Sequence, residues 1–485
     1  MIAPPAPPRR GAPPDPELLI EEAREHRRRR RRRSALAALV VAGAAALAGV
    51  VVSRPPTPGV ERVHGGPTVD VAAFVHHGRL AFVSSDTLWV LDGRSLRRAP
   101  KTPGLHPLHP SFSPDGHRLA WIESDTPQEY AAGGADETGQ LWLADGDGRG
   151  AAPVASLAHA SIVGWGAGGL AVLAGPISTR IPFGSQTTLR LIAADGRIRT
   201  LVHARDVRAA VWSPDGRRLA IVTQTPRLDS IVSVVRAAGR PARVWARWAP
   251  HDRLDGMNQI EVDAAGWWRG FGIGLWVFGD GMTHNNDETP LYTVAAPFAR
   301  PRFLAEALSD GTTRVVAAGA RALAVVADVS HGRNGGRVVW DEKELQICPR
   351  VRGACVSVTK DPGRVTLDPA WSPGGNELAF VEAPDRTLGG WDQRVLDRWS
   401  ANHVLRVYDL RTHALRTVAG ARGATVPEWA PDGDLLYEAR NGLWLLGRGA
   451  AKPVEIASPL FRPNDWPSYY GQIPWPAQFA WRPGS

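Results

Sequence analysis

The chain has 485 residues, of which 44% are hydrophobic and 22% charged, and it contains 19 Trp. This length and apolar content exclude a small disulfide-stapled scaffold and wholesale disorder, and they suit one large repeat domain or two to three ordinary ones. The net charge of +9 lies mainly at the start, because residues 1–33 hold ten Arg against five acidic residues, whereas the rest holds 47 basic against 43 acidic residues. A domain so close to neutral is not predicted to bind nucleic acid.

Residues 34–53 form the first predicted element, a transmembrane helix. Their sequence, SALAALVVAGAAALAGVVVS, has twenty residues without a charge, and at about 1.5 Å per residue it covers a hydrocarbon core about 30 Å thick. Seven consecutive arginines, Arg27 to Arg33, come directly before it, and such a cluster stays in the cytoplasm. We therefore expect a single-pass protein in which residues 1–33 are a disordered cytoplasmic tail, rich in Pro and Arg, and the chain after Ser53 lies outside the cytoplasm.

A cleaved signal peptide is the alternative, because Ala46-Leu47-Ala48 has the small-x-small pattern that a signal peptidase accepts. The protein would then be secreted. The long leader and the apolar run that continues through Val52 favour the membrane anchor. Residues 54–68 are dense in Pro and Gly and are predicted to be a semi-rigid linker. The folded domain is expected over residues 69–485.

A five-residue motif, an aromatic residue followed by Ser-Pro-Asp-Gly or a close variant, recurs four times in this domain. Each copy is followed by an apolar segment such as Arg118-Leu-Ala-Trp-Ile122. An apolar strand, a Pro-Asp-Gly turn and a second apolar strand make a β-hairpin, in which Gly supplies a positive φ. Third and fourth apolar segments come next, as in Leu141-Trp-Leu-Ala-Asp145 and Ala152 to Leu157. Such four-strand units predict an all-β propeller with four-stranded antiparallel blades. The four copies are Phe112-Ser-Pro-Asp-Gly116, Trp212-Ser-Pro-Asp-Gly216, Trp371-Ser-Pro-Gly-Gly375 and Trp429-Ala-Pro-Asp-Gly433.

The spacing of the repeats predicts the number of blades. With a unit of about 50 residues, weaker repeat starts fall at Trp165, at Trp267 or Trp268 and around Gly319. Together with a first unit over residues 74–100, this predicts eight blades, and seven stays open because residues 259–301 match the repeat poorly. The terminal Phe479-Ala-Trp-Arg-Pro-Gly484 is one more strand start with no continuation, and we expect it to pair with the first blade and close the ring.

These residues resemble a known family, the TolB-like, or WD-repeat-like, β-propeller proteins, whose blades carry the phrase W-S-P-D-G-x-x-L-A-F followed by an L-W-x-x-D strand. The resemblance covers about residues 70–485 and implies the fold. It implies no single function, because such blades occur in periplasmic proteins, in the non-catalytic domains of peptidases, and in receptors and scaffolds. TolB itself carries a soluble α/β domain before its propeller, where this chain has the predicted membrane helix, so the resemblance gives no argument for TolB's own partners.

The two cysteines, Cys348 and Cys355, flank a predicted hairpin between the third and fourth strands of one blade. Six intervening residues place them near each other across the antiparallel pair, and the expected extracytoplasmic compartment is oxidising. We therefore predict a disulfide bond. A metal site is not predicted here, because further ligands are not nearby.

The long connections of the predicted propeller are the expected site of function. They join second and third strands in five blades and open on one face, whereas the turns between first and second strands are tight. Exposed Trp and Arg favour a partner or glycan surface, although Trp391, Arg394 and Trp399 can equally form the small core of their own loop. The oxygen-rich run from Asp280 to Glu288 lacks the spacing of a known Ca²⁺ loop, so no metal is predicted. The candidate contacts are Tyr130, His284, Asp287, His331, Trp391, Arg394, Trp399 and His403.

Catalytic motifs are missing from the sequence, which has no G-x-S-x-G elbow, no H-E-x-x-H pair and no P-loop. Because the sequence ends with the propeller, we expect no C-terminal hydrolase domain. We predict a non-catalytic binding or scaffold module for a protein, glycan or small ligand at the cell envelope, without a cofactor and held to the lipid bilayer through residues 34–53. One alternative is a propeller hydrolase or lyase with its site at the mouth of the central channel; a second is an envelope sensor.

Overall fold

The computed structural model describes residues 60–62, 66–126, 138–175 except 158, 186–249 except 194, 261–278, 289–307, 315–328 except 320, 339–340, 343–350, 354–387 except 360 and 362, 398–462, and 478–484. The predicted tail and membrane helix lie outside these residues. Within the described part, no helix is long and apolar enough to cross a bilayer.

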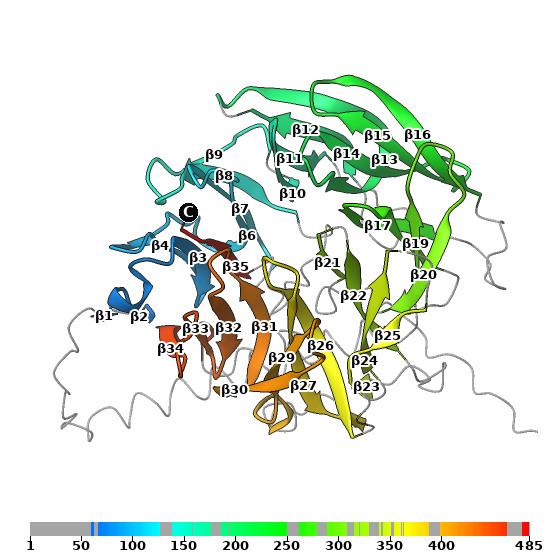
Figure 1. The fold of residues 1–485 in the computed structure, drawn as a ribbon. Coiled ribbons are helices and arrows are strands. Elements are labelled where there is room, and N and C mark those ends of the chain that lie inside the picture. Colours follow the sequence, from blue (N-terminus) through cyan, green and yellow to red (C-terminus); the bar gives the residue numbers. More distant parts are fainter. Residues whose placement is uncertain are drawn as a thin grey trace, which may run out of the picture. The chain divides into compact units, whose positions relative to one another are not determined.

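The described strands form eight four-stranded antiparallel blades, as predicted (Figure 1). We number the blades from 1 to 8 in chain order and name their strands from the first, inner strand to the fourth. Blade 1 contains β35 (Phe479–Arg482), β3 (Arg79–Ser84), β4 (Thr87–Leu91) and β5 (Leu96–Arg98). Blade 2 contains β6 (His106–Phe112), β7 (Arg118–Ser124), β8 (Gln140–Asp145) and β9 (Ala152–Pro153). Blade 3 contains β10 (Ala160–Gly166), β11 (Gly169–Ala174), β12 (Gln186–Ile192) and the first half of β13 (Ile198–Trp212).

The remaining blades continue in the same order. Blade 4 contains the second half of β13, β14 (Arg218–Gln224), β15 (Ser230–Arg236) and β16 (Arg240–Trp248). Blade 5 contains β17 (Glu261–Trp268), β18 (Gly272–Phe278), β19 (Thr289–Val294) and β20 (Arg302–Ala307). Blade 6 contains β21 (Val316–Ala318), β22 (Ala322–Asp328), β24 (Lys343–Pro349) and β25 (Val356–Ser357). Blade 7 contains β26 (Arg364–Trp371), β27 (Glu377–Pro384), β29 (Val404–Asp409) and β30 (Leu415–Arg422). Blade 8 contains β31 (Ala424–Trp429), β32 (Leu435–Ala439), β33 (Gly442–Leu446) and β34 (Val454–Ser458).

A few short elements supplement the blades. They are the 3-10 helix η1 (Ala72–Phe74), the paired strands β23 (Val339–Trp340) and β28 (Arg386–Thr387), and the N-terminal strands β1 (Val60–Arg62) and β2 (Thr68–Asp70). Each long connection of the sequence analysis falls between the second and third strands of its blade, in blades 2, 3, 5, 6 and 7.

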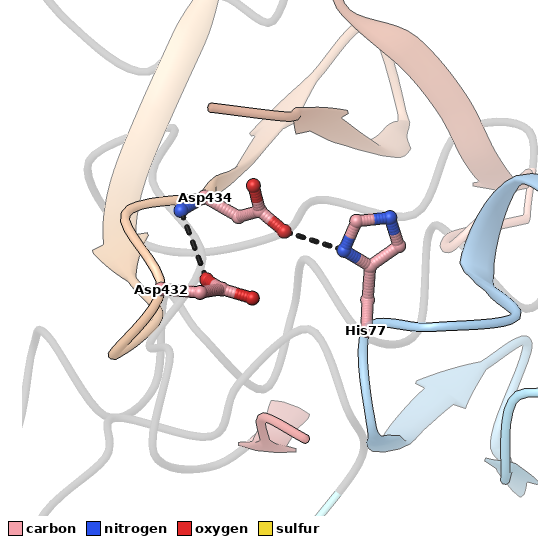
Figure 2. A group of neighbouring side chains, drawn as sticks. All are labelled: His77, Asp432 and Asp434. Atoms are coloured by element: carbon pink, nitrogen blue, oxygen red, sulfur yellow. Dashed lines mark hydrogen bonds and ion pairs between the residues drawn. The ribbon is translucent and has the colours of Figure 1, made fainter. Parts of the chain in front are cut away.

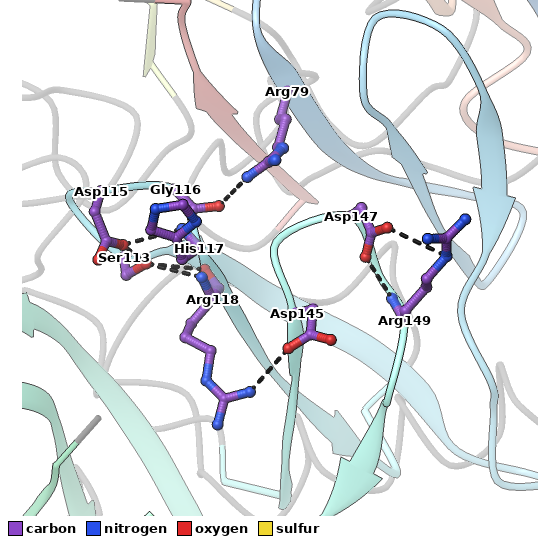
Figure 3. A network of polar contacts seen from close by, with 9 residues as sticks. All are labelled: Arg79, Ser113, Asp115, Gly116, His117, Arg118, Asp145, Asp147 and Arg149. Atoms are coloured by element: carbon purple, nitrogen blue, oxygen red, sulfur yellow. Dashed lines mark hydrogen bonds and ion pairs between the residues drawn. The ribbon is translucent and has the colours of Figure 1, made fainter. Parts of the chain in front are cut away.

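The Ser-Pro-Asp-Gly turn explains why the repeated phrase folds as a hairpin. In blade 2, the Ser113 hydroxyl donates to the Asp115 carboxylate over 2.5 Å and accepts the Arg118 backbone N–H over 2.9 Å (Figure 3). The same carboxylate accepts the backbone N–H of His117, and Gly116 has a φ of 72°. The Ser113 hydroxyl and then the His117 N–H lower the pKa of Asp115. The turn therefore satisfies its own polar groups, which lets it stand at the surface.

The Trp at the end of an inner strand ties its blade to the preceding one. The indole N–H of Trp212 donates to the Gly164 carbonyl over 2.8 Å, that of Trp371 to Val316 over 3.1 Å, and that of Trp165 to Ser111 over 3.0 Å. Trp provides both an apolar ring to fill the space between blades and one N–H to satisfy a carbonyl there. This pairing accounts for the recurrence of Trp at this position of the repeat.

Both ends of the described chain contribute to the junction of blades 8 and 1. The C-terminal strand β35 is the inner strand of blade 1, with Phe479 opposite Phe82, which confirms the predicted closure. At the other end, β2 pairs with β34 and places Val69 opposite Ala457, and β1 pairs with β2. Residues 60–62, assigned to the linker from their composition, thus extend the outer edge of blade 8.

Blades 3 and 4 are joined by one continuous strand. The first half of β13 pairs with β12, for example Ile198 with Ile192, and the second half pairs with β14, where Trp212 lies opposite Leu219. The two blades therefore form a single seven-stranded sheet. No loop separates them.

Candidate binding surface on the tight-turn face

Six of the eight candidate contacts fall outside the described residues, within or beside the long connections. They are Tyr130, His284, Asp287, His331, Trp391 and Arg394. The other two, Trp399 and His403, lie in the described part of blade 7.

Trp399 and His403 are both buried. Trp399 is 1% exposed, and its indole N–H donates to the Pro384 carbonyl over 3.0 Å. Its ring contacts the His403 ring edge to face, with centroids 4.3 Å apart. His403 Nδ1 lies 3.3 Å from the Ala424 carbonyl, to which it donates as the neutral tautomer, and burial lowers the pKa of His403 to about 3. These two side chains are packed within the protein, the alternative that the sequence left open for Trp399.

The predicted disulfide is present. Cys348 on β24 and Cys355 just before β25 are bonded, with their Cα atoms 4.1 Å apart. The bond joins the third and fourth strands of blade 6, as the spacing predicted.

Three depressions lie on the face of the propeller formed by the turns between first and second strands and between third and fourth strands. We call this the tight-turn face; it lies opposite the long connections. One depression, about 460 Å³, lies between blades 7 and 8. The other two, about 720 and 620 Å³, lie beside the Ser-Pro-Asp-Gly turn of blade 4 and share Asp215 and Arg218. All three fall within the size range of small-ligand sites.

The depression between blades 4 and 5, which reaches blade 6, is lined by tryptophans. Trp245 and Trp267 meet edge to face with ring centroids 5.4 Å apart, and the Arg218 guanidinium lies over the Trp267 ring at 4.9 Å. Trp268 contributes a third ring. Beside it, in the turn after β19, Phe298 is 73% exposed, and its backbone N–H donates to the Trp245 carbonyl over 2.9 Å. Trp245 and Trp268 are buried, so the accessible aromatic surface here comes from the half-buried Trp267 and from Phe298.

The depression between blades 3 and 4 is lined by arginines. Arg199 comes from β13, Arg217 and Arg218 from the turn of blade 4, and Arg236 from the end of β15. The one acidic residue of the lining is Asp215. Its carboxylate accepts the Ser213 hydroxyl over 2.5 Å and the Arg217 backbone N–H over 3.1 Å, and these bonds lower the pKa of Asp215.

A further cluster, His77, Asp432 and Asp434, lies at the junction of blades 8 and 1, with its ligand atoms within 4.8 Å of one another (Figure 2). One nitrogen and two carboxylates form a donor set that transition metals accept. However, Asp434 already pairs with His77 Nδ1 over 2.5 Å and accepts the Arg448 backbone N–H over 2.7 Å. Asp432 in turn accepts the Asp434 N–H. These hydrogen bonds explain the cluster without a metal ion: it is a polar contact that links blade 8 to blade 1.

Carboxyl groups with a raised pKa occur near the inner strands. Burial raises the pKa of Glu438 to about 7, and the Thr425 hydroxyl donates to this side chain over 2.6 Å. Asp368, which is buried nearby, accepts the Val426 backbone N–H over 3.1 Å. Burial also raises the pKa of Asp206 and Asp263. None of these four carboxyls lines the three depressions described above.

No family model matches the sequence, and no curated protein matches it. Solved structures with a similar fold include TolB from Acinetobacter baumannii, with a TM-score of 0.34 and 12% identity over 79% of this chain and 65% of that one. They also include the β-propeller domain of the Trilobed protease from Pyrococcus furiosus, with a TM-score of 0.40 and 11% identity over 80% of this chain and 97% of the domain. An acylaminoacyl peptidase from Pyrococcus horikoshii has a TM-score of 0.41 and 10% identity over 73% of this chain.

This chain spans 65% of the length of the TolB chain and 52% of that of the peptidase. The neighbours thus include TolB and other β-propeller proteins, as the resemblance of the repeats implied. The likeness concerns the fold alone.

Proposed function

We propose that this protein is a single-pass membrane protein that displays a non-catalytic β-propeller outside the cytoplasm, where the propeller binds a ligand of the cell envelope. The observation that carries the proposal is the pair of adjoining depressions beside the blade 4 turn, one lined by tryptophans and one by arginines. Apolar rings with a few oriented charged groups are the usual composition of a binding site. Their position on strand ends and tight turns makes the site rigid, and rigidity lowers the entropy cost of binding.

The extracytoplasmic location rests on two observations. The apolar residues 34–53 directly follow Arg27 to Arg33, which is the arrangement of an N-in, C-out anchor. The Cys348–Cys355 disulfide fits an oxidising compartment.

Ligand binding is tested with the purified full-length chain in nanodiscs. Its melting temperature is measured with panels of metals, glycans and envelope fragments, because a ligand that binds only the native state raises the melting temperature. We expect a shift with at least one ligand, and we expect Trp267→Ala to abolish it. If no ligand shifts the melting temperature and crosslinking in cells captures no partner on the tight-turn face, the proposal is wrong.

Topology is tested by labelling intact cells with a membrane-impermeant maleimide. Lys452→Cys introduces a thiol at an exposed position of blade 8, and Arg10→Cys introduces one in the N-terminal tail. We expect label on the first variant alone. Label on Arg10→Cys alone would place the propeller in the cytoplasm and overturn the proposed location.

An enzyme is the second candidate, and the raised pKa of Glu438 favours it, because general acids are tuned in this way. Against it, Glu438 and Asp368 are buried and bind the Thr425 hydroxyl and the Val426 N–H. A hydrolase or lyase activity on a glycan panel that Glu438→Gln abolishes would replace the binding proposal.

A further inference from the structure

Two arginines lie directly opposite each other on blade 4. Arg218 begins β14, Arg236 ends β15, and the register of the two strands makes them cross-strand partners. Both side chains line the same depression. Like charges directly opposite on a strand pair destabilise a sheet. Within the described residues, neither guanidinium forms an ion pair with an acid.

In blade 2, the equivalent pair of positions holds an arginine and an acid. There Arg118 begins β7, and its cross-strand partner is Asp145 at the end of β8. The Arg118 guanidinium donates to the Asp145 carboxylate over 3.1 Å (Figure 3). Arg218 and Arg118 occupy equivalent positions after the Ser-Pro-Asp-Gly turn, so Arg236 stands where blade 2 has a compensating acid. Blade 4 therefore differs from blade 2 at this position. It also differs from blade 7, where Glu377 lies opposite Asp409 and pairs with Arg416.

Two neighbouring arginines add to this charge. Arg199 lies on the adjoining blade, where its guanidinium donates to the carbonyls of Ala237 and Ala238 and is thereby fixed. Arg217 is exposed in the turn. Asp215 offsets part of this charge. Its carboxylate accepts the Ser213 hydroxyl and the Arg217 N–H, and the nearby charges of Arg218 and Arg217 also lower its pKa.

The depression between blades 7 and 8 provides an internal comparison. It is built from the same turns, but its lining balances two acids, Glu377 and Asp432, against Arg416 and Arg448. Glu377 and Arg416 form an ion pair over 3.1 Å. The excess of arginine is therefore specific to the blade 4 site and does not follow from the architecture of the face.

Resting on the function proposed above, we propose that the two depressions beside the blade 4 turn bind an acidic oligosaccharide. A carboxylate or phosphate group of the glycan takes the place of the missing acid between Arg218 and Arg236, because planar guanidinium groups bind such anions with two parallel hydrogen bonds. The Trp267 ring holds the Arg218 guanidinium flat and orients its N–H groups for this contact.

The neighbouring aromatic rings favour a glycan as the source of the anion. A sugar ring has an apolar C–H face that packs on an aromatic ring, and the half-buried Trp267 and the exposed Phe298 supply such rings next to the arginines, with Trp245 buried against Trp267. Because the two depressions share Asp215 and Arg218, adjacent sugar units of one chain can occupy both.

The test measures the affinity of the full-length chain in nanodiscs, by titration calorimetry, for four probes. They are an oligogalacturonate, its methyl-esterified neutral counterpart, galacturonic acid alone and inorganic phosphate alone. We expect the oligogalacturonate to bind at least tenfold more tightly than each of the others, with an affinity that falls as salt rises.

The main variant is Arg236→Asp, which reproduces the ion pair of blade 2. We expect it to keep or raise the melting temperature while lowering the affinity for oligogalacturonate at least tenfold, so that misfolding is not confused with loss of the site. Phe298→Ala removes an exposed ring and is expected to weaken binding without affecting the fold. Lys452→Asp is the control, since it makes the same change of charge on blade 8 and should bind normally.

Four results would overturn the inference. Equal binding of the acidic and neutral oligomers would remove the role of charge, and phosphate alone binding as tightly as the oligomer would make this a small-anion site. Unchanged oligogalacturonate binding by Arg236→Asp would place the glycan elsewhere. If no glycan binds but another ligand raises the melting temperature and Trp267→Ala abolishes the shift, the inference is wrong and the proposed binding function stands.

Discussion

The indole N–H of Trp429 donates to the Ala370 carbonyl over 3.1 Å and so joins the inner strand of blade 8 to that of blade 7. Trp429→Phe keeps most of the ring but leaves the carbonyl without this donor. We expect the free energy of unfolding to fall by about 1 kcal/mol, measured by urea denaturation. Trp267→Phe is the control, because the Trp267 indole N–H makes no hydrogen bond within the described residues; an equal loss there would contradict the assignment.

Glu438 predicts a loss of stability as pH rises. Its pKa in the fold is about 7, above the ordinary value of 4.5, so the fold favours the protonated carboxyl. This contribution is complete below about pH 4.5 and is lost as pH rises through 7, by up to about 3 kcal/mol. Glu438→Gln keeps an acceptor for Thr425 without the charge. We expect its stability relative to the unsubstituted protein to increase between pH 4.5 and 7; a difference independent of pH would be inconsistent with burial of a protonated carboxyl.

For His403 we predict the opposite pH dependence, a loss of stability as pH falls. Its pKa of about 3 lies below the ordinary 6.5, so the fold favours the neutral ring. Stability from this group is present above pH 6.5 and is lost as pH falls toward 3, by up to about 5 kcal/mol. His403→Gln keeps a donor for the Ala424 carbonyl and cannot become charged. In thermal melts, the melting temperature of this variant relative to that of the unsubstituted protein should rise as pH falls. Parallel curves for the two proteins would show that the ring is already solvated.

The disulfide should stabilise the domain moderately. Cross-linking Cys348 to Cys355 closes a short loop, and the chain-entropy relation gives about 2 kcal/mol for a loop of this length. The double variant Cys348→Ser with Cys355→Ser should lose this amount in urea unfolding. Dithiothreitol should destabilise the unsubstituted protein and leave the double variant unchanged. Sensitivity of the double variant to dithiothreitol would point to another target.

The junction of blades 8 and 1 should depend on Asp434. Asp434→Ala removes the partner of His77 and the acceptor of the Arg448 N–H, and we expect a loss of about 2 kcal/mol because two partly buried hydrogen bonds are lost. The melting temperature of the unsubstituted protein should not respond to zinc, manganese or EDTA. A rise with one of these metals that Asp434→Ala abolishes would make the cluster a metal site.

The repeats were sufficient to predict the fold. The Ser-Pro-Asp-Gly turn and its flanking apolar segments are local, so the hairpins, the disulfide hairpin and the closing strand Phe479–Arg482 follow from the order of residues. Eight blades were favoured, but seven stayed open because residues 259–301 match the repeat poorly. Strand β1 was not predicted, because Val60–Arg62 lies among Pro and Gly and pairs with residues outside any repeat.

The candidate site was not predicted, because it depends on partners that are distant in the sequence. The sequence analysis favoured the long connections, whereas the arginines and tryptophans gather on the opposite face. Arg218 and Arg236 are separated by the whole of a hairpin, and Arg199 comes from the neighbouring blade. One signal was present: aligning blade 4 with blade 2 places Arg236 where Asp145 stands, so the excess of arginine in blade 4 is visible once the repeats are aligned.

The continuous strand β13 also determines how far the stabilising effect of a bound ligand extends through the protein. Arg199 lies in its first half, and the turn that carries Arg217 and Arg218 begins directly after its end at Trp212. A molecule that binds these arginines together contacts residues at both ends of β13, a strand that belongs to blades 3 and 4. Its binding would therefore be expected to suppress hydrogen exchange along the whole seven-stranded sheet, well beyond the residues that it touches.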